Sequence, residues 1–252
     1  MGNKLEGELV RKWCMLHDIV VLSETKTTAS PSLPGFVAIN NSKHRHGGVA
    51  VLIKRYLYPS VSYVDVDDEG AIWFELRCVP GVMFCGMYNE PSDSPYFRPA
   101  TFASIPAHLE SGKHCVIVGD LNARLGSRVH SVDESCGLSH HVLDDTVNAN
   151  GRSLAQTCIA NRLTLVNNLR AGDHQWNGNL TYRKKQLWMS EVDLCVVSLP
   201  LVEAISHFTV DQNLKYPSDH SPVSVGFDFG HCLNTCTIGE LVRGGPKKKE
   251  QI

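Results

Sequence analysis

The stretch HCVIVGDLNA at residues 114–123 joins an apolar run to a polar turn, and it indicates the class of fold. Residues 115–118 are apolar and mostly β-branched, which is typical of a buried strand. Asp120 and Asn122 follow that run almost directly. Polar side chains at the ends of buried strands are how an α/β scaffold presents a site to solvent. The stretch therefore predicts a strand whose end carries functional groups.

Acidic or imidazole groups stand beside apolar runs at three further places in the chain. They are Glu24 after residues 19–22, Asp193 at the start of residues 192–197, and Asp219 with His220 before residues 223–229. One such residue has an ordinary explanation as a solvated loop acid or a turn cap. Four separate strand ends that carry acid, amide or imidazole groups instead favour a shared site.

Strand-like runs dominate the rest of the chain. They lie at residues 19–22, 49–53, 61–66, 71–76, 82–88, 115–118, 163–166, 180–183, 192–197, 204–210 and 223–229. Helical spacing of apolar residues is confined to segments near residues 5–16, 102–109 and 154–159. This pattern is too rich in strands for a doubly wound sheet. We predict an α/β (α+β) fold in which two β-sheets pack face to face with helices outside.

Length and charge limit the organisation and the partners. The chain has 252 residues, 42% of them hydrophobic and 20% charged, with a formal net charge of −2. We predict one domain over residues 1–229 and a flexible basic tail over residues 230–252, which contains three consecutive lysines. Because the net charge is slightly negative, binding to a polyanion must depend on local basic patches or on a bound cation.

The cysteines and the apolar runs indicate the compartment. The nine cysteines are irregularly spaced and lie mostly inside apolar runs. Such spacing is typical of reduced thiols in an intracellular protein. No apolar run is long enough to cross a bilayer. We therefore expect a nuclear or cytoplasmic protein with no membrane partner.

The spacing of the polar residues suggests specific chemistry. Asp120 and Asn122 are two positions apart, so in an extended segment both side chains face the same way and aim at one phosphate. The alternative is a turn stabilised by these side chains themselves. Asp193 is placed to accept a hydrogen bond from His220 and fix its tautomer. A lone histidine is otherwise more often a structural residue.

In order and spacing, these motifs resemble the endonuclease/exonuclease/phosphatase superfamily. Within it, the chain is most similar to the apurinic/apyrimidinic-type endonuclease domain of non-LTR (LINE-type) retrotransposons. The resemblance covers nearly all of residues 3–229, and its motifs are LSETK at 22–26, GGVA at 47–50, YNEPSDSP at 88–95, GDLNA at 119–123, NGR at 150–152, SEVD at 190–193 and SDH at 218–220.

The resemblance implies a four-layer sandwich of two mixed sheets flanked by helices, and a divalent cation, Mg²⁺ with Mn²⁺ as the alternative. Glu24 and Asp219 would bind the cation. The implied partner is double-stranded DNA, nicked to leave a 3′-hydroxyl for reverse transcription. A reverse transcriptase domain in the same polypeptide and a monomeric state are further expectations.

The resemblance also implies roles for the other site residues. His220, oriented by Asp193, would contact the phosphate or activate the water. Asp120 would position or deprotonate the attacking water. Asn122 would donate a hydrogen bond to a phosphate oxygen, and Tyr88 would hydrogen-bond the phosphate.

One element of the family pattern is missing from the sequence. The family begins with a strand whose end carries a metal-site Asn, whereas this chain begins at what looks like the following helix. We therefore expect that strand to be absent, which leaves two alternatives open. The first alternative to the endonuclease, which the missing strand favours, is a catalytically impaired remnant that at most binds nucleic acid. The second is another phosphoesterase of the superfamily that acts on inositol phosphates or lipid head groups.

Two basic clusters are candidates for DNA contact. Arg45 lies in the segment KHRH at residues 43–46, and Arg183, Lys184 and Lys185 are consecutive. Basic side chains at strand ends could bind phosphates. Solvated loop charge is an equally good explanation of both clusters.

Overall fold

The computed structural model describes residues 7–26, 29–41, 47–67, 70–109, 112–129, 136–185, 187–213, 215–216 and 218–230. The predicted tail from residue 231 onward lies outside these ranges, as does Arg45. None of the helices within them is long and apolar enough to cross a membrane.

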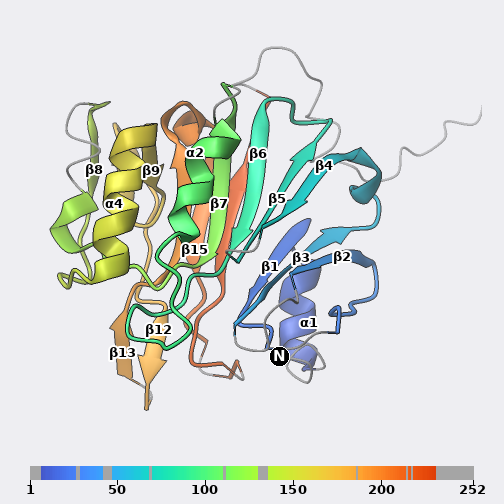
Figure 1. Cartoon of the computed structure of the whole chain (residues 1–252), viewed down its shortest axis with the longest axis horizontal. Helices are drawn as coiled ribbons and strands as arrows, with labels where there is room; N and C mark the ends of the chain where they lie inside the picture. Colours follow the sequence, from blue (N-terminus) through green and yellow to red (C-terminus); the bar gives the residue numbers. More distant parts are fainter. Residues whose placement is uncertain are drawn as a thin grey trace, which may run out of the picture.

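A mixed six-stranded sheet forms the centre of the fold (Figure 1), in the order β4-β5-β6-β7-β14-β9. Only the pair β6–β7 is parallel in this sheet. Short turns connect β4, β5 and β6, so they pair antiparallel as neighbours. Its strands are β4 (Val61–Val66), β5 (Ala71–Leu76), β6 (Val82–Met87), β7 (His114–Asp120), β9 (Leu163–Leu165) and β14 (Asp193–Ser198).

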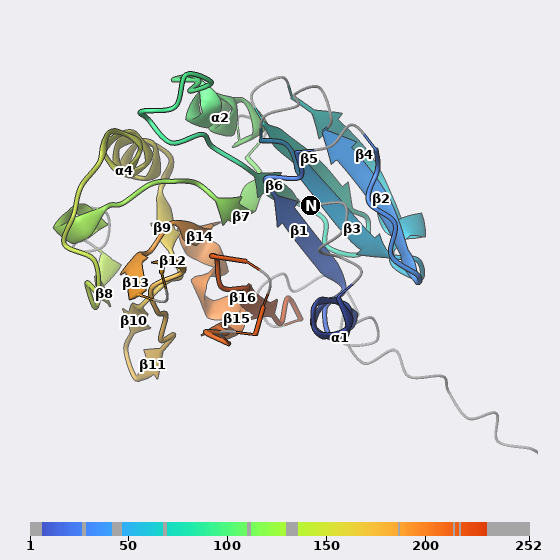
Figure 2. The ribbon, with the colours of Figure 1, turned by 90° about the horizontal axis from the view of Figure 1, so that it is seen from below.

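A second layer of strands packs on one face of this sheet (Figure 2) and consists of two antiparallel parts. One part has the order β1-β3-β2 and the other is the pair β15-β16. Apolar side chains of both layers share one core cluster, which includes Val51, Phe74 and Phe208. The strands are β1 (Ile19–Ser23), β2 (Phe36–Asn41), β3 (Val49–Lys54), β15 (Ile205–Val210) and β16 (Val223–Phe227).

Helices cover the outer faces of the two layers. α2 (Ser104–Leu109) and α4 (Ala149–Asn161) lie on the six-stranded sheet, where Ile105 and Leu154 join a second core cluster with Trp73. α1 (Glu8–Met15) packs on the three-stranded part through Cys14, which contacts the cluster around Leu52. The predicted four-layer sandwich with helices outside is thus confirmed.

Short strands make up two smaller sheets at one side of the molecule. The sheet β11-β10-β8 and the hairpin β12-β13 lie beyond β9 and β14 (Figures 1 and 2). Their bounds are β8 (Leu138–His140), β10 (Leu169–Ala171), β11 (His174–Gln175), β12 (Tyr182–Lys184) and β13 (Leu187–Ser190). The hairpin projects from the lower end of the molecule in Figure 1.

Candidate active site

The strand directions bring the polar residues to one end of the sandwich. β6 and β7 run parallel, so Tyr88 and Asp120 both lie where these strands end. β14 runs antiparallel to β7, and Asp193 at its start lies opposite Asp120 in the register. The Asp120 N–H donates to Ser23 Oγ at 3.2 Å, which links the end of β7 to the end of β1.

The centre of the site is an ion pair between His220 and Asp193. His220 Nδ1 lies 2.8 Å from Asp193 Oδ2, as the sequence predicted. Tyr182 of the hairpin stacks at a tilt on the His220 ring, with 5.1 Å between ring centroids. The Asp193 N–H donates to the buried Thr181 Oγ1 at 3.0 Å. His220 is therefore held between Asp193 and the hairpin.

Asp120 completes a compact acidic cluster with this pair. One ligand atom each from Asp120, Asp193 and His220 lies within 4.8 Å of the others. Burial raises the pKa of Asp120 well above its ordinary value, and the charge of Asp193 adds to that effect. Burial alone would lower the pKa of His220, but the hydrogen bond and charge of Asp193 outweigh it and raise that pKa to about 9. The imidazole is thus a cation at neutral pH.

Glu24 lies beside this cluster with its carboxylate already engaged. Its Oε1 accepts from the Tyr88 hydroxyl at 3.0 Å, and its Oε2 from Lys26 Nζ at 2.9 Å. Tyr88 is buried, and its pKa is raised by burial and then by the charges of Glu24, Glu90 and Asp120. The phenol therefore stays protonated and acts as a hydrogen-bond donor.

Asn122 does not extend β7, so the prediction that it faces the same way along a strand as Asp120 is wrong. The chain turns after Asp120, and Asn122 has a left-handed backbone with φ of 46°. Its N–H donates to Asp120 Oδ1 at 3.1 Å, so the alternative of a side-chain-stabilised turn is the observed one. Asn122 Nδ2 donates to Asn89 O at 2.9 Å. This turn still places Asn122 at the site.

Further asparagines support this turn, and the sequence interpretation assigned them no role. Asn148 Nδ2 donates to Asn122 O at 2.8 Å, and Asn150 Nδ2 donates to Glu90 O at 2.9 Å. Asn148 is also the N-cap of α4, where its Oδ1 accepts from the Gly151 N–H at 2.7 Å. The helix-capping pattern N-x-N-G at residues 148–151 is the sequence feature that could have indicated this role.

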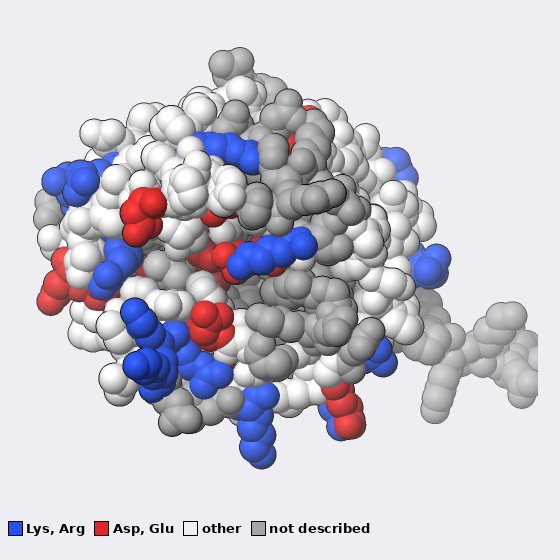
Figure 3. Space-filling view, turned by 60° about the horizontal axis from the view of Figure 1, so that its bottom comes forward, with Lys and Arg blue, Asp and Glu red and all other residues white. Residues whose placement is uncertain are grey.

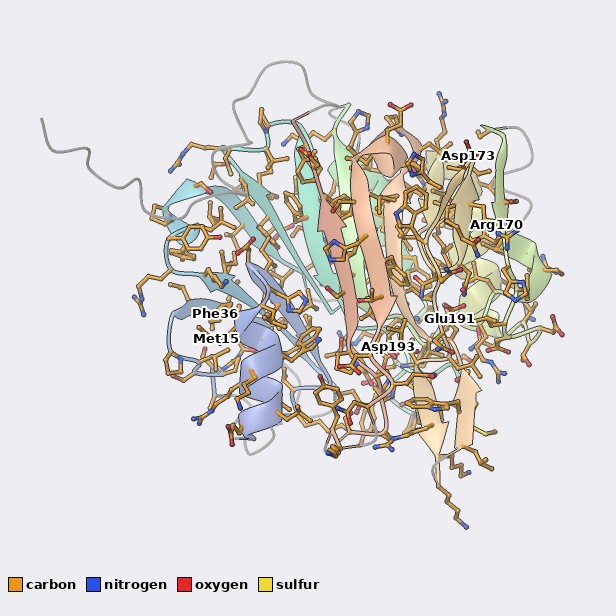
Figure 4. The ribbon with its side chains drawn as sticks, turned by 180° about the vertical axis from the view of Figure 1, so that it is seen from behind. Met15, Phe36, Arg170, Asp173, Glu191 and Asp193 are labelled. Atoms are coloured by element: carbon orange, nitrogen blue, oxygen red, sulfur yellow. The ribbon has the colours of Figure 1, made fainter. Side chains whose placement is uncertain are left out.

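Glu191 is a second residue whose role the sequence did not indicate. Its Oε1 accepts from Asn167 Nδ2 at 3.1 Å and from Asn168 Nδ2 at 3.0 Å. Asn167 Nδ2 also donates to the Asp193 backbone oxygen at 3.1 Å. Burial raises the pKa of Glu191 to about 7. Figure 4 shows Glu191 and Asp193 at the same end of the sheet, far from Asp173.

A cavity of about 320 Å³ opens beside these groups, and Glu24, Asp120, Asp193, Asp219 and His220 all line it. Acidic side chains occupy a hollow in the middle of the face shown in Figure 3, with Lys and Arg side chains around it. Asp219 is exposed, and among the described residues it does not belong to the tight cluster of Asp120, Asp193 and His220.

The donor set fits a divalent cation. Mg²⁺ binds carboxylate oxygens and keeps several of its waters, so it needs few protein ligands and some open space. The facing carboxylates of Asp120 and Asp193 beside a solvent-accessible cavity satisfy both conditions. Glu24 and Asp219 lie on the wall of the same cavity.

Three of the four basic residues predicted to contact DNA lie on the hairpin, and the fourth, Arg45, is outside the described residues. Lys184 and Lys185 are exposed at its tip. Arg183 is half-buried instead: its Nη2 donates to Ser218 O at 2.8 Å, and its guanidinium lies 5.8 Å from the centre of the Trp188 ring. Arg183 thus stabilises the loop that carries Asp219 through a hydrogen bond to its backbone.

Comparison with solved structures confirms the fold. A 3′ phosphatase, NExo from Neisseria, bound to a product DNA hairpin, is 20% identical over 90% of this chain and 96% of its own, with a TM-score of 0.63. The AP endonuclease LMAP from Leishmania major is 14% identical over 89% and 84%, with a TM-score of 0.65. The endonuclease domain of TRAS1, a telomere-specific non-LTR retrotransposon, is 15% identical over 86% and 88%, with a TM-score of 0.55.

A search of curated protein sequences found no match. The comparison with protein families did find a match. The matched range covers most of the chain and every strand-end residue of the site. Residues 2–220 match the Endonuclease/Exonuclease/phosphatase family, so the chain belongs to that family of phosphoesterases.

Proposed function

We propose that this protein is a divalent-cation-dependent DNA endonuclease that nicks one strand and leaves a 3′-hydroxyl for target-primed reverse transcription. The observation that carries the proposal is the cluster of Asp120, Asp193 and His220 beside an open cavity. It combines a proton acceptor, an oriented imidazolium and a cation site, which are the groups that phosphodiester hydrolysis requires.

The catalytic role of each residue follows from the pKa of its side chain. Asp120, with its raised pKa, accepts a proton from the attacking water. His220, a cation at neutral pH, donates a hydrogen bond to a phosphate oxygen as negative charge develops there. The water oxygen bonds to phosphorus, and the bond from phosphorus to the 3′ oxygen breaks. The 3′ oxygen takes up a proton from solvent, and the phosphate stays on the 5′ oxygen of the following nucleotide.

The other groups hold the phosphate and the cation. Glu24 and Asp219, both on the cavity wall, would hold Mg²⁺ or Mn²⁺. The cation, when bound, supplies positive charge that offsets the charge of the scissile phosphate. Asn122 Nδ2 has a second hydrogen available for a phosphate oxygen, and Tyr88 fixes the Glu24 carboxylate.

Double-stranded DNA is the proposed substrate. The similar solved structures include a phosphatase bound to a DNA hairpin and a retrotransposon endonuclease domain, which supports this assignment. Lys184 and Lys185 project from the hairpin whose Tyr182 touches His220, so phosphates bound there would lie near the site. A reverse transcriptase in the same polypeptide, a monomeric state and a nuclear or cytoplasmic location belong to the same proposal.

Relaxation of supercoiled plasmid with Mg²⁺ tests this function. We expect nicked circles with 3′-hydroxyl ends from the wild type, loss of nicking with EDTA, and its return when Mg²⁺ is added in excess. His220→Ala should abolish nicking, whereas His207→Ala, on the exposed side of β15, should not. The idea fails if the wild type does not nick, or if His220→Ala nicks as fast as the wild type.

The hairpin contact has its own test in DNA binding. The double variant Lys184→Ala, Lys185→Ala should weaken binding of a DNA duplex at low salt. It should also lower the slope of log affinity against log salt by roughly 1–2, because each phosphate contact releases counterions. Lys12→Ala on α1 is the matched control. An unchanged salt slope would remove the hairpin lysines from the interface.

A second candidate function is nucleic-acid binding without cleavage. The observation that favours it is the division of the second layer, because β1, which leads to Glu24, has no described strand between it and β16. This candidate predicts duplex binding at low salt but no nicking at any Mg²⁺ or Mn²⁺ concentration. Nicking that a chelator abolishes would exclude it.

A further inference from the structure

The Tyr88 hydroxyl lies between two carboxylates, those of Glu24 and Glu90. Tyr88 Oη is 3.0 Å from Glu24 Oε1 and 3.1 Å from Glu90 Oε2. A phenol carries a single hydrogen, so it donates fully to one carboxylate at a time. The other carboxylate then faces the lone pairs of the phenol oxygen, which repel it. The three side chains therefore have two alternative hydrogen-bonded states.

Contacts on two sides hold Glu90 in this position. Its backbone oxygen accepts from Asn150 Nδ2 at 2.9 Å. Its side chain packs against Gly47, where a Cβ would lie 2.6 Å from Glu90 Oε1. Gly47 has a φ of 84°, and its backbone oxygen accepts from the Lys26 N–H at 2.8 Å. The segment that follows Glu24 and the side chain of Glu90 thus meet at a backbone position that only glycine fits.

The two carboxylates differ in their surroundings. Glu24 lines the active-site cavity, and Lys26 Nζ lies 2.9 Å from its Oε2 as a counter-ion. Within the part of the chain that the structure describes, Glu90 does not line that cavity, and its carboxylate pairs with no basic side chain. Glu90 therefore reaches the cation-binding side of the site only through Tyr88 and Glu24. It is placed to act on Glu24, and not as a cation ligand itself.

Cation binding at Glu24 changes which of the two states is favoured. When a cation is bound, the Glu24 oxygens carry less free negative charge, so this carboxylate becomes a weaker acceptor for the Tyr88 hydroxyl. Glu90 is then the stronger acceptor, and the hydroxyl turns toward it. Thermodynamic linkage requires the reverse effect as well. An acceptor that draws the hydroxyl away from Glu24 makes Glu24 a better ligand for the cation.

We propose that Glu90 is a positioning residue that sets the cation affinity of Glu24 through the Tyr88 hydroxyl. Without a cation the hydroxyl donates to Glu24, and with a cation on Glu24 it donates to Glu90. The charge of Glu90 therefore favours the state in which Glu24 is free to bind the cation. This inference rests on the cation site of the proposed function, but not on the identity of the substrate or on bond cleavage.

Binding of Mn²⁺ to the whole chain without DNA tests this role, with the electron paramagnetic resonance signal of the free ion as the readout. Glu90→Gln keeps an oxygen near the hydroxyl but removes the charge that attracts it. We expect the dissociation constant for Mn²⁺ to rise by about 5- to 20-fold. Asp93→Asn, which removes an exposed carboxylate from the same loop, should change it by less than about twofold. Equal dissociation constants for Glu90→Gln and the wild type would overturn the proposal.

A double-mutant cycle with Tyr88→Phe separates an effect through the hydroxyl from an effect of charge at a distance. The phenylalanine ring keeps the packing of Tyr88 but has no hydrogen to donate. Glu90→Gln should therefore change the Mn²⁺ dissociation constant by less than about twofold in the Tyr88→Phe background. The same fold-change in both backgrounds would show that Glu90 acts by charge alone, and it would overturn the proposal. Thermal unfolding in EDTA checks that each variant is folded.

The Mg²⁺ dependence of plasmid nicking distinguishes this role of Glu90 from the endonuclease activity itself. Glu90→Gln should raise the Mg²⁺ concentration at half-maximal nicking by the same factor and reach the wild-type rate at saturating Mg²⁺. A lower maximal rate with an unchanged Mg²⁺ midpoint would overturn the role of Glu90 and leave the activity in place. Coupled Mn²⁺ binding without any nicking would refute the endonuclease and leave the role of Glu90 in place. No Mn²⁺ binding by the wild type would overturn both.

Discussion

At the scale of single residues, Asp193 controls the orientation and the charge of His220. Its carboxylate holds the ring nitrogen at 2.8 Å and raises the pKa of the imidazole, so Asp193→Asn should lose both the orientation and the charge. We expect the nicking rate to fall by roughly 10²–10⁴-fold. A pH–rate profile should show the descending limb near pH 9 shifted to lower pH. Asp173→Asn, between β10 and β11 of a different sheet and far from Asp193 in Figure 4, is the control, and an unchanged rate in Asp193→Asn would contradict this role.

The Glu191 carboxyl makes the free energy of unfolding depend on pH. Its pKa is raised by burial to about 7 in the folded protein, from an ordinary value of 4.5. The folded state therefore holds a proton that the unfolded state releases, and stability falls as pH rises through that window. Glu191→Gln keeps an oxygen for Asn167 and Asn168 but removes this dependence.

The difference between Glu191→Gln and the wild type should therefore change with pH. Relative to the wild type, the free energy of unfolding of the variant should be higher at pH 8 than at pH 5 by about 1–3 kcal/mol. Urea unfolding in EDTA at both pH values measures it. A constant difference between the two proteins at all pH values would contradict the burial of this carboxyl.

At the scale of elements, α4 packs closely on the turn that carries the site. A Cβ on Gly151 would lie 1.8 Å from Arg124 O, so the first turn of α4 must move if this residue gains a side chain. Gly151→Ala should then disturb the Asn148 hydrogen bonds and lower the free energy of unfolding by about 2–4 kcal/mol. Gln156→Ala, exposed on the same helix, should change it little. Thermal and urea unfolding of both variants distinguish a tight contact from a general helix effect.

At the scale of the whole molecule, the two strand layers differ in how completely they are covered. β6 is buried along its whole length between α2 and the second layer, whereas β16 is half-buried throughout. We expect amides of β5, β6, β7 and β14 to exchange only by global unfolding and those of β15 and β16 to exchange through local opening. Hydrogen exchange followed by mass spectrometry measures this, and uniform protection in both layers would contradict it.

The sequence by itself determined most of the elements and most residues of the candidate site, but it did not reveal β2 or the short strands β8, β10, β11 and β13. Apolar runs of period two and long buried runs specify strands such as β7, because such side chains must leave water. The acidic residues beside those runs could also be recognised from the sequence, because a charged residue directly next to an apolar strand is conspicuous. The pairing of Asp193 with His220 followed from residue types alone.

Only the tertiary structure decided how these residues meet. Asn122 turns away from the strand because backbone hydrogen bonding to Asp120 favours a left-handed turn, which periodicity does not reveal. Glu191, Thr181 and Asn167 became part of the site through contacts between segments far apart in the chain. The pairing of β14 with both β7 and β9 likewise joins segments far apart in the chain, and pairing is a long-range property that no local pattern encodes.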